Sequence, residues 1–84
     1  MDKKTLENLQ NYANNLMKKE YNGFAELDKY EMINDYDGDY YENLVFRVGV
    51  EESWQETIDV YYDEDMSEDF VVGMLMGNVA QLRK

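Results

Sequence analysis

The sequence predicts an α+β fold with the element order α-β-β-β-α, in a single domain that spans residues 1–84. Apolar residues recur at helical spacing near both ends of the chain, and the middle of the chain alternates with a period of two. Short polar segments separate the alternating runs, and short connections join neighbouring strands antiparallel. We therefore expect a three-stranded antiparallel sheet with the helices packed on one face.

The first predicted helix begins after Asp2, whose side chain can accept a hydrogen bond from a free N–H group of the first turn. Lys18 and Lys19 fall in the last turn, where cations suit the helix dipole. The helix ends at Asn22-Gly23, a pair typical of helix C-termini. Its apolar stripe consists of Leu6, Leu9, Ala13, Leu16 and Met17.

The three predicted strands cover Phe24–Ile33, Leu44–Val50 and Thr57–Tyr62, joined by Asn34–Tyr41 and Glu51–Gln55. A two-residue turn at Asp37-Gly38 would place Glu31 opposite Leu44 and put a charge on the core face. A longer, irregular loop instead puts Tyr30 and Met32 on the face of Leu44 and Phe46. We expect this longer loop, with Tyr30 and Tyr62 half-buried in the sheet.

The last predicted helix covers Ser67–Leu82, with Ser67 as its N-cap and two acids in its first turn. Its predicted apolar face consists of Phe70, Met74, Leu75, Val79 and Leu82. Gly73 and Gly77 form a small-residue stripe on the same helix. This stripe indicates either close packing on the first helix or the sheet, or the seam of a homodimer.

Charge is concentrated in the middle of the chain. Residues 20–69 hold 17 of the 19 acidic residues and two basic ones, so this stretch carries a formal charge of −15 (17 acids minus 2 bases). Such a field destabilises the folded chain by self-repulsion, which suggests a strongly basic partner. It also argues against direct binding to nucleic acid or to an anionic membrane surface.

Several classes of function are disfavoured by composition. Cys and His are absent, which removes thiolate nucleophiles, zinc–cysteine sites and the usual general base. The hydroxyl groups have no histidine or paired lysine to activate them. The apolar run Phe70–Met76 is too short to cross a bilayer, and the polar N-terminus does not read as a signal peptide. We expect a cytoplasmic protein that is not an enzyme and needs no cofactor or metal.

Three acidic clusters fall in predicted loops beside aromatic residues. The run Asp35, Asp37, Asp39 and Glu42 begins like a calcium-binding loop, but glycine and glutamate do not follow at the positions that such a loop requires. A solvated tip, a partner-binding tip and a calcium site remain as alternatives. Trp54, between acids in the second connection, is either an interface anchor or a lid over the core.

The acidic loops, together with Asn43-Leu-Val-Phe-Arg-Val48, resemble in size, charge and element order the small acidic DNA-mimic inhibitors that phages direct against nucleases. The likeness is strongest to type II anti-CRISPR proteins. It implies that loop carboxylates replace phosphates on a basic nucleic-acid-binding protein, in the cytoplasm of the host cell. An immunity protein for a toxin nuclease, or an adaptor dimerising through Gly73 and Gly77, are alternatives. The candidate partner-binding residues are Asp35, Asp37, Asp39, Tyr40, Tyr41, Glu42, Trp54, Asp63, Glu64 and Asp65.

Overall fold

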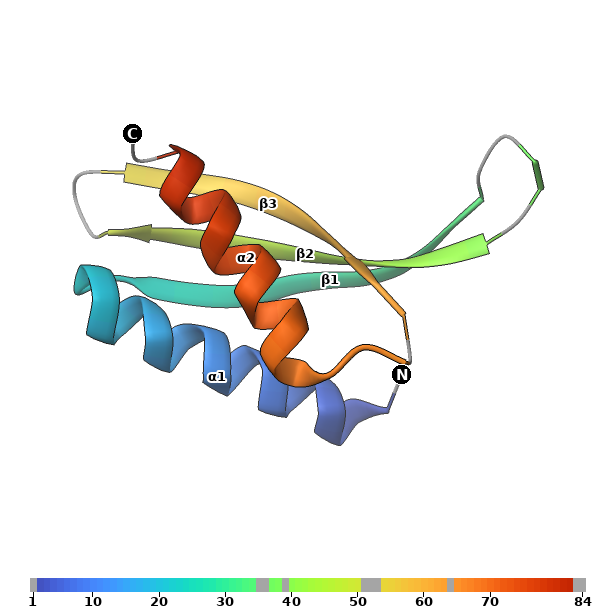
Figure 1. The fold of residues 1–84 in the computed structure, drawn as a ribbon, viewed down its shortest axis with the longest axis horizontal. Coiled ribbons are helices and arrows are strands. Elements are labelled where there is room, and N and C mark those ends of the chain that lie inside the picture. The colour runs from blue at the N-terminus through green and yellow to red at the C-terminus, as the bar shows by residue number, and fades with distance from the viewer. Residues whose placement is uncertain (1, 35–36, 39, 51–53, 64, 83–84) are drawn as a thin grey trace.

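The computed structural model contains two helices and three strands in the order α1-β1-β2-β3-α2 (Figure 1). It describes residues 2–34, 37–38, 40–50, 54–63 and 65–82. The strands form an antiparallel sheet in the order β1-β2-β3. This is the α+β fold predicted from the sequence. In the described part of the chain, neither helix is long and apolar enough to cross a bilayer.

Helix α1 (Lys3–Tyr21) begins and ends where the sequence predicts. The Asp2 carboxylate accepts a hydrogen bond from the Thr5 N–H at 2.7 Å. Asn22 adopts the left-handed conformation with φ 53°, and its N–H donates to the carbonyl of Lys18 at 3.0 Å. Polar groups at both ends of the helix are therefore satisfied by the predicted caps.

Strands β1 (Phe24–Asn34) and β2 (Tyr40–Val50) form the first hairpin. Asn34 pairs with Tyr40 and Tyr30 with Leu44, so five residues connect the strands and the longer loop is confirmed. The register shifts between Leu27 and Lys29, which marks a bulge at Asp28. Because of this extra residue, Leu27 and Tyr30 both point to the core face, and the alternation of β1 looks weak in the sequence.

Strand β3 (Trp54–Tyr62) is longer than predicted. It starts at Trp54, which pairs with Val50, so Trp54 lies in the strand and not in the preceding loop. Gly49 sits at this end of the sheet, where a Cβ atom would lie 2.3 Å from the carbonyl oxygen of Trp54. The close approach of the backbone here requires a residue without a side chain.

The core lies between one face of the sheet and both helices. It is built from Leu9, Ala13, Met17, Ala25, Leu44, Phe46, Val48, Ile58, Val60, Val71, Val72, Leu75 and Val79. Cross-strand partners share a face, and the register places Leu44 beside Val60 and Phe46 beside Ile58 on the helix side. Figure 1 shows the ends of β1 and β2 near Asn34 and Tyr40 extending beyond the helices.

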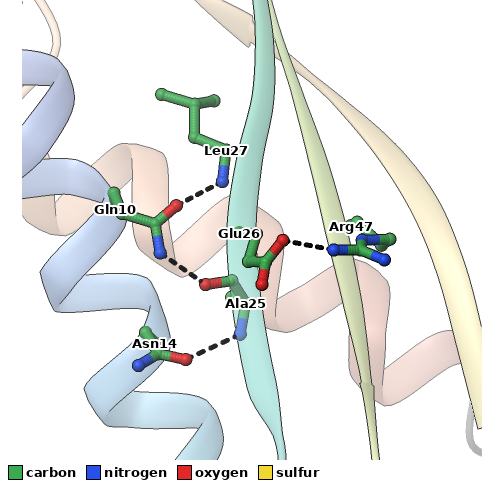
Figure 2. A network of polar contacts seen from close by, with 6 residues as sticks. All are labelled: Gln10, Asn14, Ala25, Glu26, Leu27 and Arg47. Atoms are coloured by element: carbon green, nitrogen blue, oxygen red, sulfur yellow. Dashed lines mark hydrogen bonds and ion pairs between the residues drawn. The ribbon is translucent and has the colours of Figure 1, made fainter.

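Two side chains of α1 close the free edge of β1 (Figure 2). Gln10 donates to the carbonyl of Ala25 at 2.7 Å and accepts from the N–H of Leu27. The Asn14 side chain accepts from the N–H of Ala25 at 3.0 Å. An unpaired strand edge can template pairing with another chain, so these bonds protect β1 from such pairing.

Helix α2 (Glu68–Leu82) has the predicted cap, because the Ser67 hydroxyl accepts from the N–H of Phe70 at 3.1 Å. Its buried face differs from the prediction. Val71, Val72, Leu75 and Val79 face the core, whereas Phe70 is exposed. The helix is apolar almost all round, so spacing alone did not identify which side packs on the sheet.

Candidate partner-binding surface

A hollow of about 290 Å³ lies where the three strands end near the projecting hairpin. Residues from all three strands and the segment after β3 line it: Met32, Tyr40, Tyr41, Glu42, Tyr61, Tyr62 and Asp63. The hollow is thus lined by five aromatic or acidic residues of β2 and β3, by Met32 of β1, and by Asp63, which follows β3. We call this set the acidic–aromatic end.

The strand register brings these side chains together. Met32, Glu42 and Tyr62 are successive cross-strand partners, so they lie side by side on the helix face of the sheet. On the other face the rings of Tyr41 and Tyr61 lie 5.8 Å apart, tilted by 39°. Tyr40, the first residue of β2, has 67% of its surface exposed. Aromatic surface is therefore available on both sides of the strand ends.

Glu42 is fixed in place by Tyr30, whose hydroxyl donates a hydrogen bond to the Glu42 carboxylate. This hydrogen bond, together with partial burial and the negative charge of Glu42, raises the pKa of Tyr30 from 10 to about 12. Tyr30 also contacts the Met32 sulfur at 3.8 Å. The carboxylate of Glu42 is thus held by the sheet itself before any partner arrives.

The segment that connects β3 to α2 contributes further acids at the same end. The carboxylate of Asp63 accepts from the N–H of Asp65 at 3.0 Å, and its carbonyl accepts from the N–H of Met66 at 2.8 Å. This is the local turn that Asp side chains favour. Asp65, two residues later, is exposed. Asp63 thus shapes the turn and also borders the hollow.

Arg47, one of the two basic residues in the acidic middle of the chain, forms an ion pair within the sheet. Its guanidinium pairs with Glu26 on the neighbouring strand (Figure 2) and lies 5.8 Å from the ring centre of Phe24. Glu26 raises the pKa of Arg47 through this hydrogen bond and its charge. The described residues that line the hollow include no basic residue, so Glu42 and Asp63 give the acidic–aromatic end a single sign of charge.

The structure brings four of the predicted site residues together around the hollow: Tyr40, Tyr41, Glu42 and Asp63. Asp37 and Asp65 are exposed in the neighbouring segments. Predictions for Asp35, Asp39 and Glu64 fall outside the described residues. Met32, Tyr61 and Tyr62 line the hollow although they were not among the predicted site residues; only the register, which pairs Tyr62 with Glu42, identifies them.

Trp54 lies at the opposite end of the sheet from the acidic–aromatic end. It pairs with Val50, ten residues along β2 from Tyr40, which corresponds to roughly 33 Å of extended strand. Trp54 is half-buried and packs against the core. Its position agrees with the interpretation of Trp54 as a lid over one end of the core.

Two other features bear on alternative sites. In the part of the chain that the structure describes, no group of three or more acidic residues is arranged to hold a metal ion. A larger hollow of about 340 Å³ lies between α1 and β1, but its rim mixes Lys3 and Lys29 with Glu7 and Asp28. Its mixed charge gives it no selectivity for a strongly basic partner.

Comparison with known proteins adds no relative: no family model, curated protein or solved structure matches the chain.

Proposed function

We propose that this protein is an inhibitor of a nucleic-acid-binding enzyme and occupies the enzyme's basic surface in place of DNA. The proposed target is an RNA-guided nuclease, which would make the protein a phage-encoded anti-CRISPR acting in the cytoplasm of the host cell. In this proposal the protein catalyses no reaction and binds no cofactor. An immunity protein that neutralises a toxin nuclease would use the same surface.

The observation that carries the proposal is the gathering of carboxylates and tyrosines at one end of the sheet. The hairpin supplies Tyr40 and Glu42, and the segment after β3 supplies Asp63 and Asp65. Residues distant in sequence thus form one surface of a single charge sign. Such a surface attracts basic partners and speeds their association.

Carboxylates and tyrosines would act differently on such a partner. An arginine positioned for a phosphate can bind a carboxylate bidentately without rearrangement. Interface affinity, however, comes from a few aromatic anchors that exclude water around the charged pairs. Tyr40 is the best anchor candidate because it is the most exposed of the large side chains at the hollow. Trp54 is left out of this surface because it lies at the opposite end of the sheet.

A pull-down tests the proposal and names the target. The tagged protein is incubated with a lysate that contains RNA-guided and other basic nucleases, and duplex DNA is added to half of the sample. We expect one nuclease to be recovered and to be lost when DNA is present. Recovery of a nuclease that DNA does not displace would contradict occupation of the DNA site.

Variants of two exposed apolar side chains provide a test and its control. Tyr40→Ala should reduce recovery of the nuclease at least about tenfold, as expected for a hot spot. Leu82→Ala removes an exposed apolar side chain at the last residue of α2, which does not line the hollow, and should leave recovery unchanged. Equal losses for both variants would show that the acidic–aromatic end has no special role.

A further inference from the structure

The exposed large apolar side chains fall into two groups. Met32, Tyr40 and Tyr61 surround the hollow, whereas Phe70 and Leu82 lie on α2. The second group lies in an uncharged segment of that helix. From Phe70 to Leu82 the sequence contains no acidic or basic residue, although 32% of the chain is charged. A solvent-facing helical segment of this length without charge in such a chain indicates a covered surface.

The exposed side of α2 has the spacing of a helix–helix seam. Phe70, Met74, Gly77 and Gln81 are separated by four, three and four residues, as the core positions of a coiled coil are. Phe70 is 55% exposed, Gly77 and Gln81 are exposed, and Met74 is half-buried. Val71, Val72, Leu75 and Val79 already pack on the sheet from the other side. The helix therefore has a second, uncharged side available for a partner.

We propose that this seam binds the same seam of a second copy of the chain, in an antiparallel two-fold arrangement. In the register that centres on residues 75 and 76, Met74 of one copy lies opposite Gly77 of the other. Phe70 lies opposite Gln81. A Cβ atom on Gly77 would meet nothing within 4 Å, so the backbone there leaves room for the longer Met74 side chain. The pattern is complementary to itself, as a two-fold interface requires.

Charge favours a second copy in this orientation. Each copy carries −11, so two copies approach with least repulsion through a surface that lacks acids. The antiparallel arrangement separates Glu68 of the two copies by about 22 Å along the helix, well beyond the screening length of about 8 Å at physiological salt. A parallel pair would place these acids at the same level along the helix axis. In the antiparallel pair, the acidic N-terminus of α2 in one copy lies beside the C-terminus of α2 in the other copy. Arg83 and Lys84 follow this C-terminus in the sequence.

The dimer should be weak and strengthened by salt. Helix α2 has 15 residues and is therefore about 22 Å long, which makes the seam small for a stable interface. Added salt screens the remaining repulsion between the two copies. The projecting hairpin lies beyond the helices, so the acidic–aromatic end stays open in both copies (Figure 1).

Sedimentation equilibrium over a range of protein concentrations tests the dimer. We expect the wild-type chain to dimerise reversibly, and more tightly in moderate than in low sodium chloride. Gly77→Glu adds a carboxylate to the seam and should weaken the dimer at least about tenfold. Thr57→Glu adds the same charge at an exposed strand position and should change it little. A wild-type chain that is monomeric throughout, or equal effects of the two variants, would overturn the proposal.

Disulfide trapping tests the orientation, because the chain contains no cysteine. A mixture of Phe70→Cys and Gln81→Cys chains should form a mixed disulfide. Phe70→Cys alone should not, because two copies of residue 70 are about 16 Å apart along the antiparallel seam and a disulfide needs Cα atoms within about 7 Å. Trapping of Phe70→Cys with itself and not with Gln81→Cys would contradict the antiparallel arrangement.

Discussion

The hydroxyl of Tyr30 donates a hydrogen bond to the carboxylate of Glu42 across the β1–β2 hairpin. This pair joins the core side of β1 to the acidic–aromatic end, because Tyr30 packs against the core and Glu42 borders the hollow. It fixes one carboxylate of the proposed binding surface on a strand and not on a loop. A group held on a rigid element costs less entropy when a partner binds.

Tyr30 should titrate later than an ordinary tyrosine. Its pKa is raised from 10 to about 12, chiefly by the hydrogen bond to Glu42. The folded state therefore holds this proton more tightly than the unfolded chain does. The stability that results is full below pH 10 and is lost as the pH rises from 10 toward about 12.

The absorbance of tyrosinate during an alkaline titration measures this effect. We expect Tyr30 to ionise about two pH units after an ordinary tyrosine, and Tyr30→Phe to remove that late step. Tyr12, whose pKa is also raised by its hydrogen bond to Asp69, should still titrate late in this variant. Tyr61→Phe, which changes an exposed tyrosine, serves as the control and should leave the late step in place. A wild-type titration without a late step, in a chain that remains folded, would show that the Tyr30–Glu42 bond does not persist in solution.

Loss of the Gln10 side chain should destabilise the fold. Gln10 bonds both the carbonyl of Ala25 and the N–H of Leu27, and Gln10→Ala leaves both groups without this partner. We expect a decrease of about 1–3 kcal/mol in the free energy of unfolding, measured by urea denaturation. Asn15→Ala, at an exposed position of the same helix, should change it by less than about 0.5 kcal/mol. Equal effects would mean that water replaces Gln10 without cost.

The glycines of α2 should tolerate a methyl group, unlike those at the end of the sheet. A Cβ atom at Gly73 or Gly77 meets nothing within 4 Å, so each Gly→Ala change should raise the free energy of unfolding by about 0.5–1 kcal/mol. This finding excludes close packing within the domain as the reason for the two glycines. Gly49→Ala should instead destabilise, because its Cβ would lie 2.3 Å from the Trp54 carbonyl oxygen. Thermal melts at low protein concentration compare the three variants; destabilisation by the α2 changes would contradict the open space around them.

Salt should stabilise the domain, because self-repulsion among its carboxylates is screened. If screening recovers about 1 kcal/mol, the melting temperature rises by about 4–8 °C between low and moderate sodium chloride. The double variant Asp37→Asn/Asp65→Asn has less repulsion to relieve and should respond less. A flat response of the wild-type chain would indicate that its acids are already neutralised within the fold.

The helices, their caps and the core-facing side of β2, which carries Leu44 and Phe46, were predicted from the sequence, because caps and alternation are local signals. The bulge at Asp28 was hidden, because one extra residue merely weakens the alternation of β1. Nothing in a single sequence indicated that Gln10 reaches Ala25, since that contact joins an ordinary helix residue to a strand edge.

The candidate site was predicted only in part, for the same reason. The acids and tyrosines of the hairpin were identified from their clustering, but Met32 and Tyr62 join them only through the register. Trp54 was grouped with them although it lies at the other end of the sheet, because sequence proximity to acids says nothing about which end a strand residue occupies.

In the proposed function, the position of the acids, and not the net charge, directs the protein to a DNA-binding surface. This is tested most directly by displacement of labelled target DNA from a guide-loaded RNA-guided nuclease. The double variant Asp37→Asn/Asp65→Asn and the control Glu20→Gln/Glu56→Gln each remove two exposed carboxylates and have the same net charge. We predict that the first variant needs at least about tenfold more protein for half-displacement and that the control matches the wild type. Equal behaviour of the two variants, or no displacement by the wild-type protein, would contradict the account.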